Sequence, residues 1–312
     1  MEFSAIPDTV RTRQWGPNVL AIHFLSGTVL PERFDQRPLA THGLFDYHVH
    51  PNFSIDAHGT VDEYCERALR RGLSGLCFTS HFDSNPDSDG RANRMKVDGE
   101  ILPATVSNMR PYVEAVLAGR EAYAARGLQV LLGVEFGWYP GCEPVAERLL
   151  NTYEFDYVLC GIHELENICL CSGHRISRCY SRYDSIEFVR QYFHEARAAA
   201  MSGLFHALAH IPYYLRYAPG FYGEDMLNHH IPHIDLLLEA CLRTDTELEI
   251  NTSGIRHGRG YYYPIESIIN AARTTGVTVG RLGSDAHEPD HLALDFDNAV
   301  RFLKPVPPVA LS

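Results

Sequence analysis

Short apolar segments alternate with segments of helical length from residue 44 almost to the C-terminal end of the chain. The apolar segments have the length of β-strands and lack a polar face, which is typical of parallel strands covered by helices on both sides. Strand–helix alternation of this kind predicts an α/β fold. Seven such units favour a closed or nearly closed barrel, with an open doubly wound sheet as the alternative. The seven predicted strands cover residues 44–49, 76–79, 129–134, 156–161, 204–209, 247–250 and 277–282.

The intervening segments carry recognisable helix boundaries. Thr60 and Glu63 form a capping box, in which two side chains bond reciprocally to the backbone of the first turn. Gly72 ends that helix, because glycine readily takes the left-handed conformation found at helix ends. The predicted helices cover residues 60–71, 111–126, 144–150, 185–201, 232–242, 264–275 and 297–302, and two segments, 83–98 and 164–183, are predicted to be irregular.

Residues 1–42 differ from the rest of the chain, because they are punctuated by proline and arginine and show weak periodicity. We predict that they form an N-terminal extension, with a short hairpin of residues 21–25 and 28–30. Residues 43–312 are predicted to form one domain. No glycine-rich phosphate-binding motif of the dinucleotide or P-loop kind occurs, so a nucleotide-binding open sheet has no positive support.

The composition limits the partners and the compartment of the protein. The net charge of −12 argues against broad binding to nucleic acids or anionic membranes, which requires a basic surface. No apolar stretch approaches the ~20 residues of a membrane span. The sequence begins without the basic and apolar segments of a secretory signal. The eight cysteines are therefore predicted to be reduced and the protein cytoplasmic.

The predicted strands share a second feature, because each carries histidine or a carboxylate at its C-terminal end. Residues two apart on a strand face the same side, so His48 and His50 of the first strand project together. In a barrel of parallel strands these ends form one face, where the active sites of such barrels lie. The polar residues at the ends of the other strands are His81, Asp83, Glu135, His163, His210, Glu249, Asn251, Asp285 and His287.

Histidine accounts for 17 of the 312 residues, and its placement at strand ends indicates metal binding. A single strand-end histidine is commonly a hydrogen-bonded structural residue, but recurrence at the same position on several strands needs a common cause. The strand-end histidines and carboxylates together exceed the roughly four ligands that one zinc-type ion takes. We therefore predict a cluster of two or three divalent ions. Zn, Mn and Fe all suit a mixed histidine and carboxylate site.

These motifs resemble the polymerase and histidinol phosphatase (PHP) family over residues 44–299. Within the family, the monofunctional histidinol-phosphate phosphatase branch is the one that segments 180–184, 203–210 and 249–256 resemble. The resemblance implies a distorted (β/α)7 barrel of the TIM type (PHP fold) and a trinuclear metal centre. It also implies phosphomonoesterase activity by a metal-bound hydroxide on a small phosphorylated substrate such as histidinol phosphate, without a nucleic-acid polymer or a membrane as partner.

The resemblance further implies a role for each strand-end residue. One metal ion is assigned to His48, His50, Glu135 and Asp285. A second ion shares Glu135 as a bridge and is held by His163 and His210. A third ion is held by Asp56, His81 and His287. His58 competes with Asp56 for the last site, since it lies two residues further along the same loop.

The candidate catalytic residues are Asp285, His287, Arg256 and Arg182. Asp285 or His287, next to the metals, is expected to position the nucleophile or to protonate the leaving alkoxide. Arg256 and Arg182 are candidate phosphate clamps, because a guanidinium can bind two phosphate oxygens at once. The alternative for both arginines is an ordinary surface ion pair.

Two departures from the family pattern leave the substrate open. Pro212 stands where the branch has an aspartate two residues after His210, and tyrosine is unusually frequent beyond that point. The tyrosines concerned are Tyr213, Tyr214, Tyr217, Tyr222, Tyr261, Tyr262 and Tyr263. Asn251, Thr252 and Ser253 fit equally well with contact to the substrate and with capping of a turn.

Other activities also fit the sequence. A phosphodiesterase or nucleotide phosphatase on the same scaffold could stack a base on the tyrosines, and a non-catalytic domain is a further alternative. An amidohydrolase-like C–N or C–O hydrolase commonly has a bridging lysine; Lys96 and Lys304 are not placed for it, although Glu135 could serve. The group Cys169, Cys171, His174 and Cys179 matches no common zinc motif and is predicted to belong to a disordered loop or a lid loop.

Overall fold

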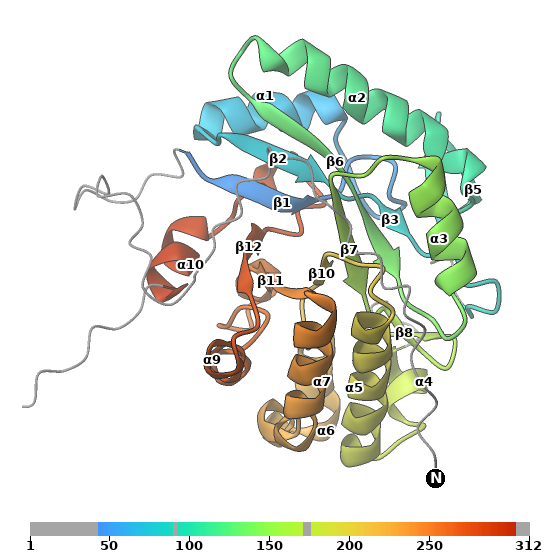
Figure 1. Ribbon diagram of the computed structural model, residues 1–312, viewed down its shortest axis with the longest axis vertical. Coiled ribbons are helices and arrows are strands. Elements are labelled where there is room, and N and C mark those ends of the chain that lie inside the picture. Colours follow the sequence, from blue (N-terminus) through green and yellow to red (C-terminus); the bar gives the residue numbers. More distant parts are fainter. Residues whose placement is uncertain (1–42, 90–92, 171–175, 304–312) are drawn as a thin grey trace, which may run out of the picture.

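Seven parallel strands form the central sheet, in the order in which they occur along the chain (Figure 1). They are β1 (Phe45–Val49), β2 (Gly75–Phe78), β6 (Gln129–Gly137), β7 (Tyr157–Gly161), β10 (Ala207–Leu208), β11 (Glu247–Asn251) and β12 (Val279–Gly283). Val49 pairs with Ala286, so the first and last strands meet in a nearly closed barrel. The predicted α/β barrel is confirmed. The computed structural model describes residues 43–89, 93–170 and 176–303; the predicted extension 1–42 and its hairpin lie outside this part of the chain.

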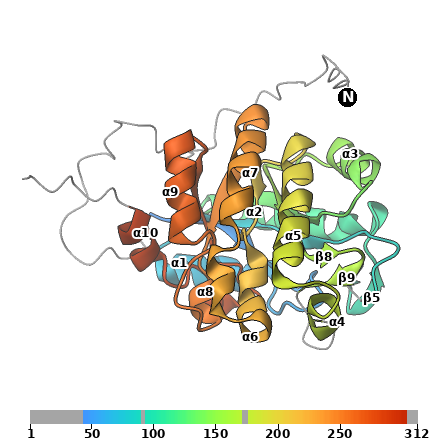
Figure 2. The same ribbon diagram turned by 90° about the horizontal axis from the view of Figure 1, so that it is seen from below.

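Helices cover the barrel on both sides, as parallel strands require. α1 (Val61–Arg71) and α2 (Arg110–Ala124) lie together on one side (Figure 1). α5 (Ser185–Met201), α7 (Ile231–Thr244) and α9 (Glu266–Thr275) lie next to one another on the opposite side (Figure 2). The remaining helices are α3 (Glu143–Thr152), α4 (Ile176–Tyr180), α6 (Ala218–Tyr222), α8 (Ser253–Arg256) and α10 (Phe296–Leu303), with 3₁₀ turns at Ser107–Met109, Tyr213–Arg216, Glu224–Asn228 and Pro289–His291.

The helix boundaries predicted from capping signals are confirmed. In α1, the Thr60 hydroxyl accepts from the Glu63 backbone N–H at 3.2 Å, and the Glu63 carboxylate accepts from the Thr60 N–H at 2.7 Å. The helix ends at Gly72, whose φ of 70° lies in the left-handed region that glycine tolerates. At the start of α5, the Asp184 carboxylate accepts two backbone N–H groups of the first turn.

The segment 83–98, predicted to be irregular, contains part of a hairpin. β4 (Arg94–Val97) pairs antiparallel with β5 (Glu100–Pro103). The turn between them is Asp98-Gly99, and both residues have positive φ, 49° and 84°. An Asp-Gly pair favours a two-residue hairpin turn of this kind. The two strands are short and partly polar, so they show no clear hydrophobic alternation that would predict them. The Asp-Gly pair was the sequence signal for the turn of this hairpin.

The segment 164–183 is also more regular than predicted. β8 (Glu164–Leu165) pairs antiparallel with β9 (Ile168–Cys169), and the helix α4 lies further along the same segment. Cys169 and Cys179 are buried free thiols. Cys171, His174 and Arg175 lie outside the described residues, so the lid-loop prediction stays a prediction.

β10 is a two-residue strand, whereas residues 204–209 were predicted to be extended. Only Ala207 and Leu208 pair with both β7 and β11. The backbone of His210 then turns into the left-handed region, with φ of 37°, and leaves the sheet. The apolar residues of this segment reflect its burial. Because more of its residues are buried than are paired with neighbouring strands, the apolar pattern predicted too long a strand.

The interior of the barrel is apolar away from the C-terminal ends of its strands. Arg281 lies over the rings of Tyr157 and Tyr47, with 4.7 and 5.4 Å to the centroids, and its Nε is 3.3 Å from Glu247. Since Tyr157 and Glu247 begin β7 and β11, this packing closes the barrel at the starts of its strands. The apolar interior consists of Tyr47, Cys77, Leu131, Tyr157, Leu159, Ala207 and Ala209.

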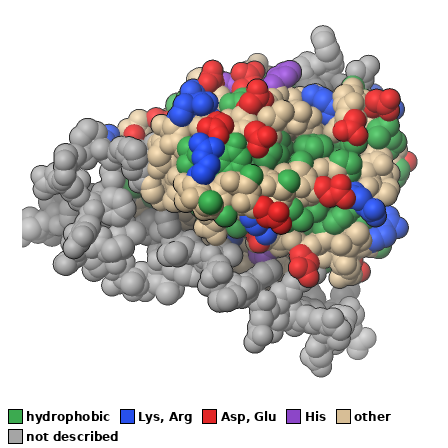
Figure 3. Space-filling view, turned by 90° about the horizontal axis from the view of Figure 1, so that it is seen from above, with side chains coloured by type: hydrophobic (Ala, Val, Ile, Leu, Met, Phe, Trp, Pro, Cys, Tyr) green, Lys and Arg blue, Asp and Glu red, His purple; other side chains and the backbone are tan. Residues whose placement is uncertain are grey.

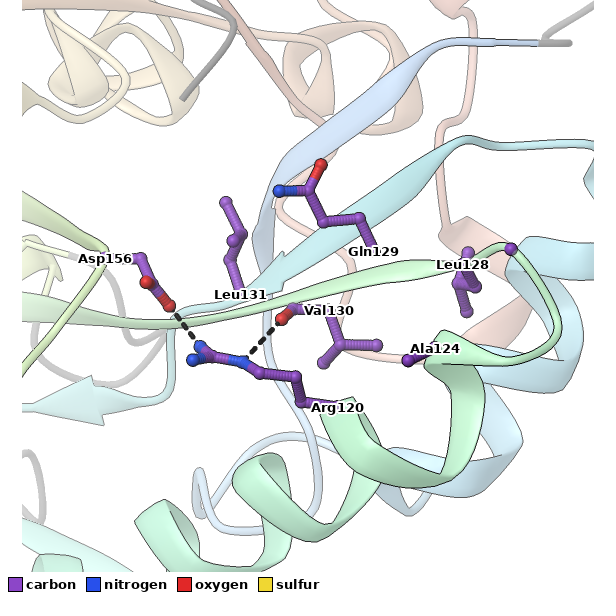
Figure 4. Close-up of a pocket in the computed structure, with 8 residues that line it drawn as sticks. Arg120, Ala124, Leu128, Gln129, Val130, Leu131 and Asp156 are labelled. Carbon is purple, nitrogen blue, oxygen red and sulfur yellow. Dashed lines mark hydrogen bonds and ion pairs between the residues drawn. The ribbon is translucent and has the colours of Figure 1, made fainter. Parts of the chain in front are cut away.

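A cavity of about 470 Å³ lies at the start of β6, at the opposite end of that strand from Glu135 (Figure 4). Arg120 in its wall donates from Nε to the Val130 carbonyl at 2.9 Å and forms an ion pair with Asp156. The charged residues that line this cavity, Arg120 and Asp156, form an ion pair with each other. The cavity therefore offers no unpaired charged group for catalysis.

Acidic and basic side chains are interspersed on the face that α1 and α2 cover (Figure 3). α1 itself begins with Asp62 and Glu63 and ends with Arg70 and Arg71. This face therefore lacks the continuous basic surface that nucleic acids require. Among the helices that the structure describes, none has both the length and the apolar character needed to cross a membrane.

Candidate metal centre

The C-terminal ends of the strands bring the candidate ligands together. β1 carries His48, β6 carries Glu135, and β3 (His81–Phe82) pairs in parallel with the last part of β6. The other side chains come from the segments that follow β1, β7, β10 and β12. Asp56, His81 and His287 are partly or largely exposed, and the rest are buried. The residues of this cluster are His48, His50, Asp56, His81, Glu135, His163, His210, Asp285 and His287.

Glu135 lies at the centre of the cluster and is fully buried. Its Oε2 is 3.3 Å from Nε2 of His48 and 3.4 Å from Nε2 of His50. The same oxygen is 2.8 Å from Nδ1 of His81. One oxygen of this carboxylate therefore faces three imidazoles from two different strands.

The second oxygen of Glu135 faces a separate pair of histidines. Oε1 is 2.8 Å from Nε2 of His210 and 3.1 Å from Nε2 of His163. Gly161 makes room for this arrangement, because a Cβ at that position would lie 2.2 Å from the His163 ring and 2.8 Å from Glu135. Glu135 thus joins two groups of nitrogen ligands, which is the geometry of a bridging carboxylate.

Asp285 completes the first group of donors. Its Oδ1 is 3.4 Å from Nε2 of His50, 3.7 Å from Nε2 of His48 and 3.4 Å from Nδ1 of His287. Its φ of 54° is unusual for a residue other than glycine. Like the left-handed backbone of His210, this conformation turns a functional side chain toward the axis of the barrel, as strained residues at functional sites often do.

Asp56 and His287 lie on the open side of the cluster. Nε2 of His287 is 3.5 Å from Oδ2 of Asp56 and 3.3 Å from Nε2 of His81, and Oδ1 of Asp56 is 3.8 Å from Nε2 of His81. The Asp56 side chain is 60% exposed, so this group marks the entrance. The competing residue, His58, contacts His287 through its backbone N–H, at 2.7 Å. The structure therefore brings Asp56, not the His58 ring, to the other donors.

The donor set fits divalent metal ions. Nε2 of His48, Nε2 of His50 and Oε2 of Glu135 are buried atoms without hydrogen-bond partners among the described residues. Buried polar atoms left in this state are costly. Mixed imidazole and carboxylate donors suit Zn, Mn and Fe. Four overlapping groups of three donor residues have their ligand atoms within 4.8 Å of one another, so the cluster has room for more than one ion.

Metal ligands must be deprotonated. Against the effect of burial, the neighbouring carboxylates hold the pKa of His48, His81 and His163 above the usual histidine value, so metal binding would release protons from these rings. Burial by itself raises the pKa of Glu135, but the positive charges of the surrounding histidines, led by His48, hold it well below its usual range. The pKa of Asp285 is depressed for the same reason, against the effect of burial. Burial and then the charges of His81 and His287 hold the pKa of His50 well below its usual value.

A model of the PHP domain matches residues 46–253, which is more than half of the chain. The chain belongs to the PHP family. The match contains the ends of β1, β6, β7 and β10, from which most of the clustered donors come. The resemblance expected from the sequence is therefore confirmed.

The chain is also similar to individual proteins that are named histidinol-phosphatases. The chain is 32% identical over 264 residues to a protein named probable histidinol-phosphatase from Deinococcus radiodurans, covering 85% of this chain and 94% of the relative. It is 29% identical over 272 residues to a protein of the same name from Clostridium acetobutylicum, covering 84% and 96%. The fold is similar to that of the Lactococcus lactis histidinol phosphate phosphatase, solved with zinc, L-histidinol and phosphate, with a TM-score of 0.67, 19% identity, and 83% and 91% coverage.

Two carboxylates that were given no role by the sequence orient the histidines of this PHP centre. Oε1 of Glu249 is 2.6 Å from Nδ1 of His48, and Oδ1 of Asp83 is 2.9 Å from Nδ1 of His163. Each contact leaves the opposite ring nitrogen to face Glu135, and such partners tune the basicity of a metal ligand. Both carboxylates occupy strand ends, and this position was the available signal. Glu249 also accepts from the backbone N–H of His210, at 2.8 Å.

Asp46 is a further buried carboxylate that sequence reasoning left without a role. It accepts from the backbone N–H and hydroxyl of Ser284, at 3.0 and 2.5 Å, and from the backbone N–H of Ala293, at 2.8 Å. Burial raises its pKa to about 6, against the lowering effect of these hydrogen bonds. Asp46 thus fastens the first strand to the segment after the last strand and supports the position of Asp285.

The structure places Arg256 behind the Asp285 backbone and Arg182 at the surface. Arg256 donates from Nη1 to the Ser284 carbonyl at 2.7 Å and from Nη2 to the Asp285 carbonyl at 2.8 Å. Arg182 is 52% exposed, and its Nη2 is 2.7 Å from Glu166. The two candidate clamps therefore have different surroundings, and their contact with phosphate stays a prediction.

Arg216 is a functional candidate that the sequence analysis did not single out. It donates from Nη1 to the Tyr213 hydroxyl at 2.6 Å, and its guanidinium lies 5.0 Å from the ring centroid of Tyr217. The Tyr213 ring is 4.6 Å from the ring of His210. Within the described part of the chain, no carboxylate forms an ion pair with Arg216. Its position six residues after a strand-end histidine was the only signal for it.

The segment after β11 is held by its own side chains. Oδ1 of Asn251 accepts from the Ser253 backbone N–H at 3.0 Å, and the Thr252 hydroxyl donates to the Leu294 carbonyl at 2.8 Å. These contacts show that Asn251 and Thr252 stabilise the turn into α8. The hydroxyl of Ser253 is buried without a partner among the described residues.

Proposed function

We propose that the chain is a metal-dependent phosphomonoesterase of the histidinol-phosphatase type. The observation that carries this proposal is the position of Glu135, buried with each carboxylate oxygen facing a different set of histidine nitrogens. A carboxylate in this position can hold two cations close together, as in two-metal phosphatase sites. The relative that binds L-histidinol and phosphate supports a small phosphorylated substrate.

The proposed ligands divide into three sets. His48, His50, Asp285 and Oε2 of Glu135 would hold one ion. His163, His210 and Oε1 of Glu135 would hold a second ion. Asp56, His81 and His287 would hold a third ion at the open side. Bound Zn, Mn or Fe lowers the pKa of a coordinated water and stabilises negative charge on the phosphoryl oxygens.

The residues around the ions would bind and orient the substrate. We assign phosphate binding to Arg216, because it donates to the hydroxyl of Tyr213, whose ring contacts His210, and a guanidinium presents two donors to phosphate oxygens. Arg256 would act on Asp285 by holding the carbonyl groups of its backbone. Asp285 and His287, whose Oδ1 and Nδ1 lie 3.4 Å apart, would position the nucleophile. Arg182 is retained as a second candidate clamp.

The location of the protein belongs to the same proposal. The seven cysteines that the structure describes are free and buried. Unpaired cysteines are typical of the reducing cytoplasm. A cytoplasmic location would also bring the protein to small phosphorylated metabolites.

The test is a hydrolysis screen on purified protein loaded with Zn, Mn or Fe, with metal content measured on the same sample. Histidinol phosphate and other phosphomonoesters are compared with a phosphodiester and with amide and lactone substrates. We expect phosphomonoester turnover, and loss of both activity and bound metal in Glu135→Gln. Turnover of amides or lactones alone would instead support an amidohydrolase, and full activity after loss of the metal would refute every metal-dependent reading.

A further inference from the structure

Ser54 is a buried residue of the loop between β1 and α1, four residues after His50. Two turns fold this loop back on itself. The Ser54 backbone N–H donates to the Pro51 carbonyl at 3.0 Å, and the Ser54 carbonyl accepts from the Ala57 N–H at 3.2 Å. These backbone bonds hold the Ser54 side chain where it meets the metal centre.

The hydroxyl of Ser54 contacts two of the candidate metal ligands. Its Oγ is 3.3 Å from Nδ1 of His50 and accepts from the backbone N–H of His81 at 3.1 Å. The third partner of this oxygen is the hydroxyl of Ser80, at 2.9 Å. His50 belongs to the ligand set proposed for the first ion, and His81 belongs to the set proposed for the third ion. One buried hydroxyl therefore joins two of the proposed ion sites.

The hydrogens of this network can be assigned for the metal-bound state. Nε2 of His50 is buried without a hydrogen-bond partner among the described residues and lies 3.4 Å from Oε2 of Glu135. An imidazole that binds a metal through Nε2 carries its hydrogen on Nδ1. Nδ1 then donates to Ser54, which also accepts from His81 and donates its own hydrogen to Ser80. The Ser54 hydroxyl thus uses both of its lone pairs and its one hydrogen, so its bonding capacity is filled.

The opposite arrangement of hydrogens would oppose metal binding. If the Ser54 hydroxyl donated to Nδ1 of His50, the ring hydrogen would lie on Nε2, where the ion has to bind. Ser54 is the only hydrogen-bond partner of this Nδ1 within the described part of the chain. Without the hydroxyl, Nδ1–H would be buried with no acceptor, and a buried donor in that state is costly. The hydroxyl therefore favours the ring form that binds metal.

We propose that Ser54 is a positioning residue of the metal centre, which orients the ring of His50, fixes the backbone of His81, and so couples the binding of the first and third ions. The inference rests on the ligand sets of the proposed function. Ser54 itself binds neither metal nor substrate in this role. It acts as the carboxylates of Glu249 and Asp83 do for other histidines of the centre, but with a neutral hydroxyl.

The test compares Ser54→Ala with Ser80→Ala in the full chain. Both variants remove a buried hydroxyl from the same hydrogen bond, but only the Ser54 hydroxyl contacts proposed ligands. Zinc affinity is measured by competition with a chromophoric chelator, and bound zinc per chain by elemental analysis. We expect Ser54→Ala to bind zinc about 10- to 100-fold more weakly than the wild type, as for other partners of metal-bound histidine. Ser80→Ala should bind zinc like the wild type.

Excess zinc should restore the wild-type zinc content in Ser54→Ala, because every proposed ligand is still present. Unchanged zinc affinity in Ser54→Ala, or an equal loss in Ser80→Ala, would overturn the positioning role. A loss that excess zinc does not reverse would also overturn it, since damage to the fold would then explain the result. These measurements need no turnover. A weakened Ser54→Ala variant of a protein that binds zinc but hydrolyses no phosphomonoester would refute the proposed function and leave the role of Ser54 standing.

Discussion

A histidine ligand has two ring nitrogens, and the partner of one nitrogen decides where the other one points. Glu249 engages Nδ1 of His48, and Asp83 engages Nδ1 of His163, at 2.6 and 2.9 Å. The histidines could be predicted from their repeated position at strand ends. Their carboxylate partners could not be assigned, because the side chains that meet across a barrel depend on strand register and loop path. Arg216 escaped prediction for the same reason, since it lies in a loop.

Glu249→Gln tests this control of ligand orientation. The two carboxylate oxygens of Glu249 contact Nδ1 of His48 and the backbone N–H of His210. Glutamine has the same shape as glutamate, but it lacks the negative charge and one of these two acceptor oxygens. We expect metal affinity to fall about 10- to 100-fold, as for other partners of metal-bound histidine. Competition with a chromophoric chelator measures it. Glu247→Gln, two residues earlier on β11 and paired with Arg281, is the control and should bind metal like the wild type.

Arg256→Gln distinguishes positioning of Asp285 from contact with phosphate. The variant loses two charge-assisted bonds to the Ser284 and Asp285 carbonyls. We expect kcat for a phosphomonoester and the retained metal content to fall together, kcat by roughly tenfold or more. A rise in KM with unchanged metal content would show instead that Arg256 clamps the phosphate. Arg182→Gln is assayed alongside, and such a KM rise there would support the second candidate clamp.

At the scale of elements, the sequence predicted well those features that depend on contacts within a few residues of the chain. The capping box of α1 and the Asp184 cap of α5 act within one helical turn, and both helix starts were predictable. The strand β10 was overestimated, because apolar composition reflects burial and not pairing. The β8–β9 hairpin, with two residues per strand and no Asn-Gly or Asp-Gly turn, left no pattern that periodicity could detect.

Thr60→Ala tests the contribution of the capping box. The substitution removes the hydroxyl that accepts from the Glu63 backbone N–H and leaves that donor to water. We expect the free energy of unfolding to fall by about 1 kcal/mol, with unchanged metal content. Urea denaturation measures the loss. Thr274→Ala, at an exposed position inside α9, is the control and should be neutral or slightly stabilising, since alanine is the better helix former. Equal losses in both variants would rule out a specific capping effect.

At the scale of the whole molecule, the two ends of the barrel have opposite characters. The starts of the strands are closed by Arg281 and the tyrosines around it, whereas the ends of the strands carry the buried donors. His48 and His50 begin the sheet, and Asp285 follows its last strand, where Val49 pairs with Ala286. Ions held between them would therefore join the first and last strands and link metal binding to closure of the barrel.

Removal of the metal should consequently destabilise the whole fold. A ligand that binds only the folded state, present at about 100 times its dissociation constant, adds roughly 2.7 kcal/mol, which corresponds to about 4 °C in Tm for a chain of this size. We expect a chelator to lower the Tm of the metal-loaded protein by at least that amount in a calorimetric scan, and readdition of Zn or Mn to restore it. In Glu135→Gln, which lacks the bridging charge between the two histidine groups, the chelator should shift Tm much less. An equal shift in both proteins would mean that the stabilising ion lies outside the Glu135 cluster.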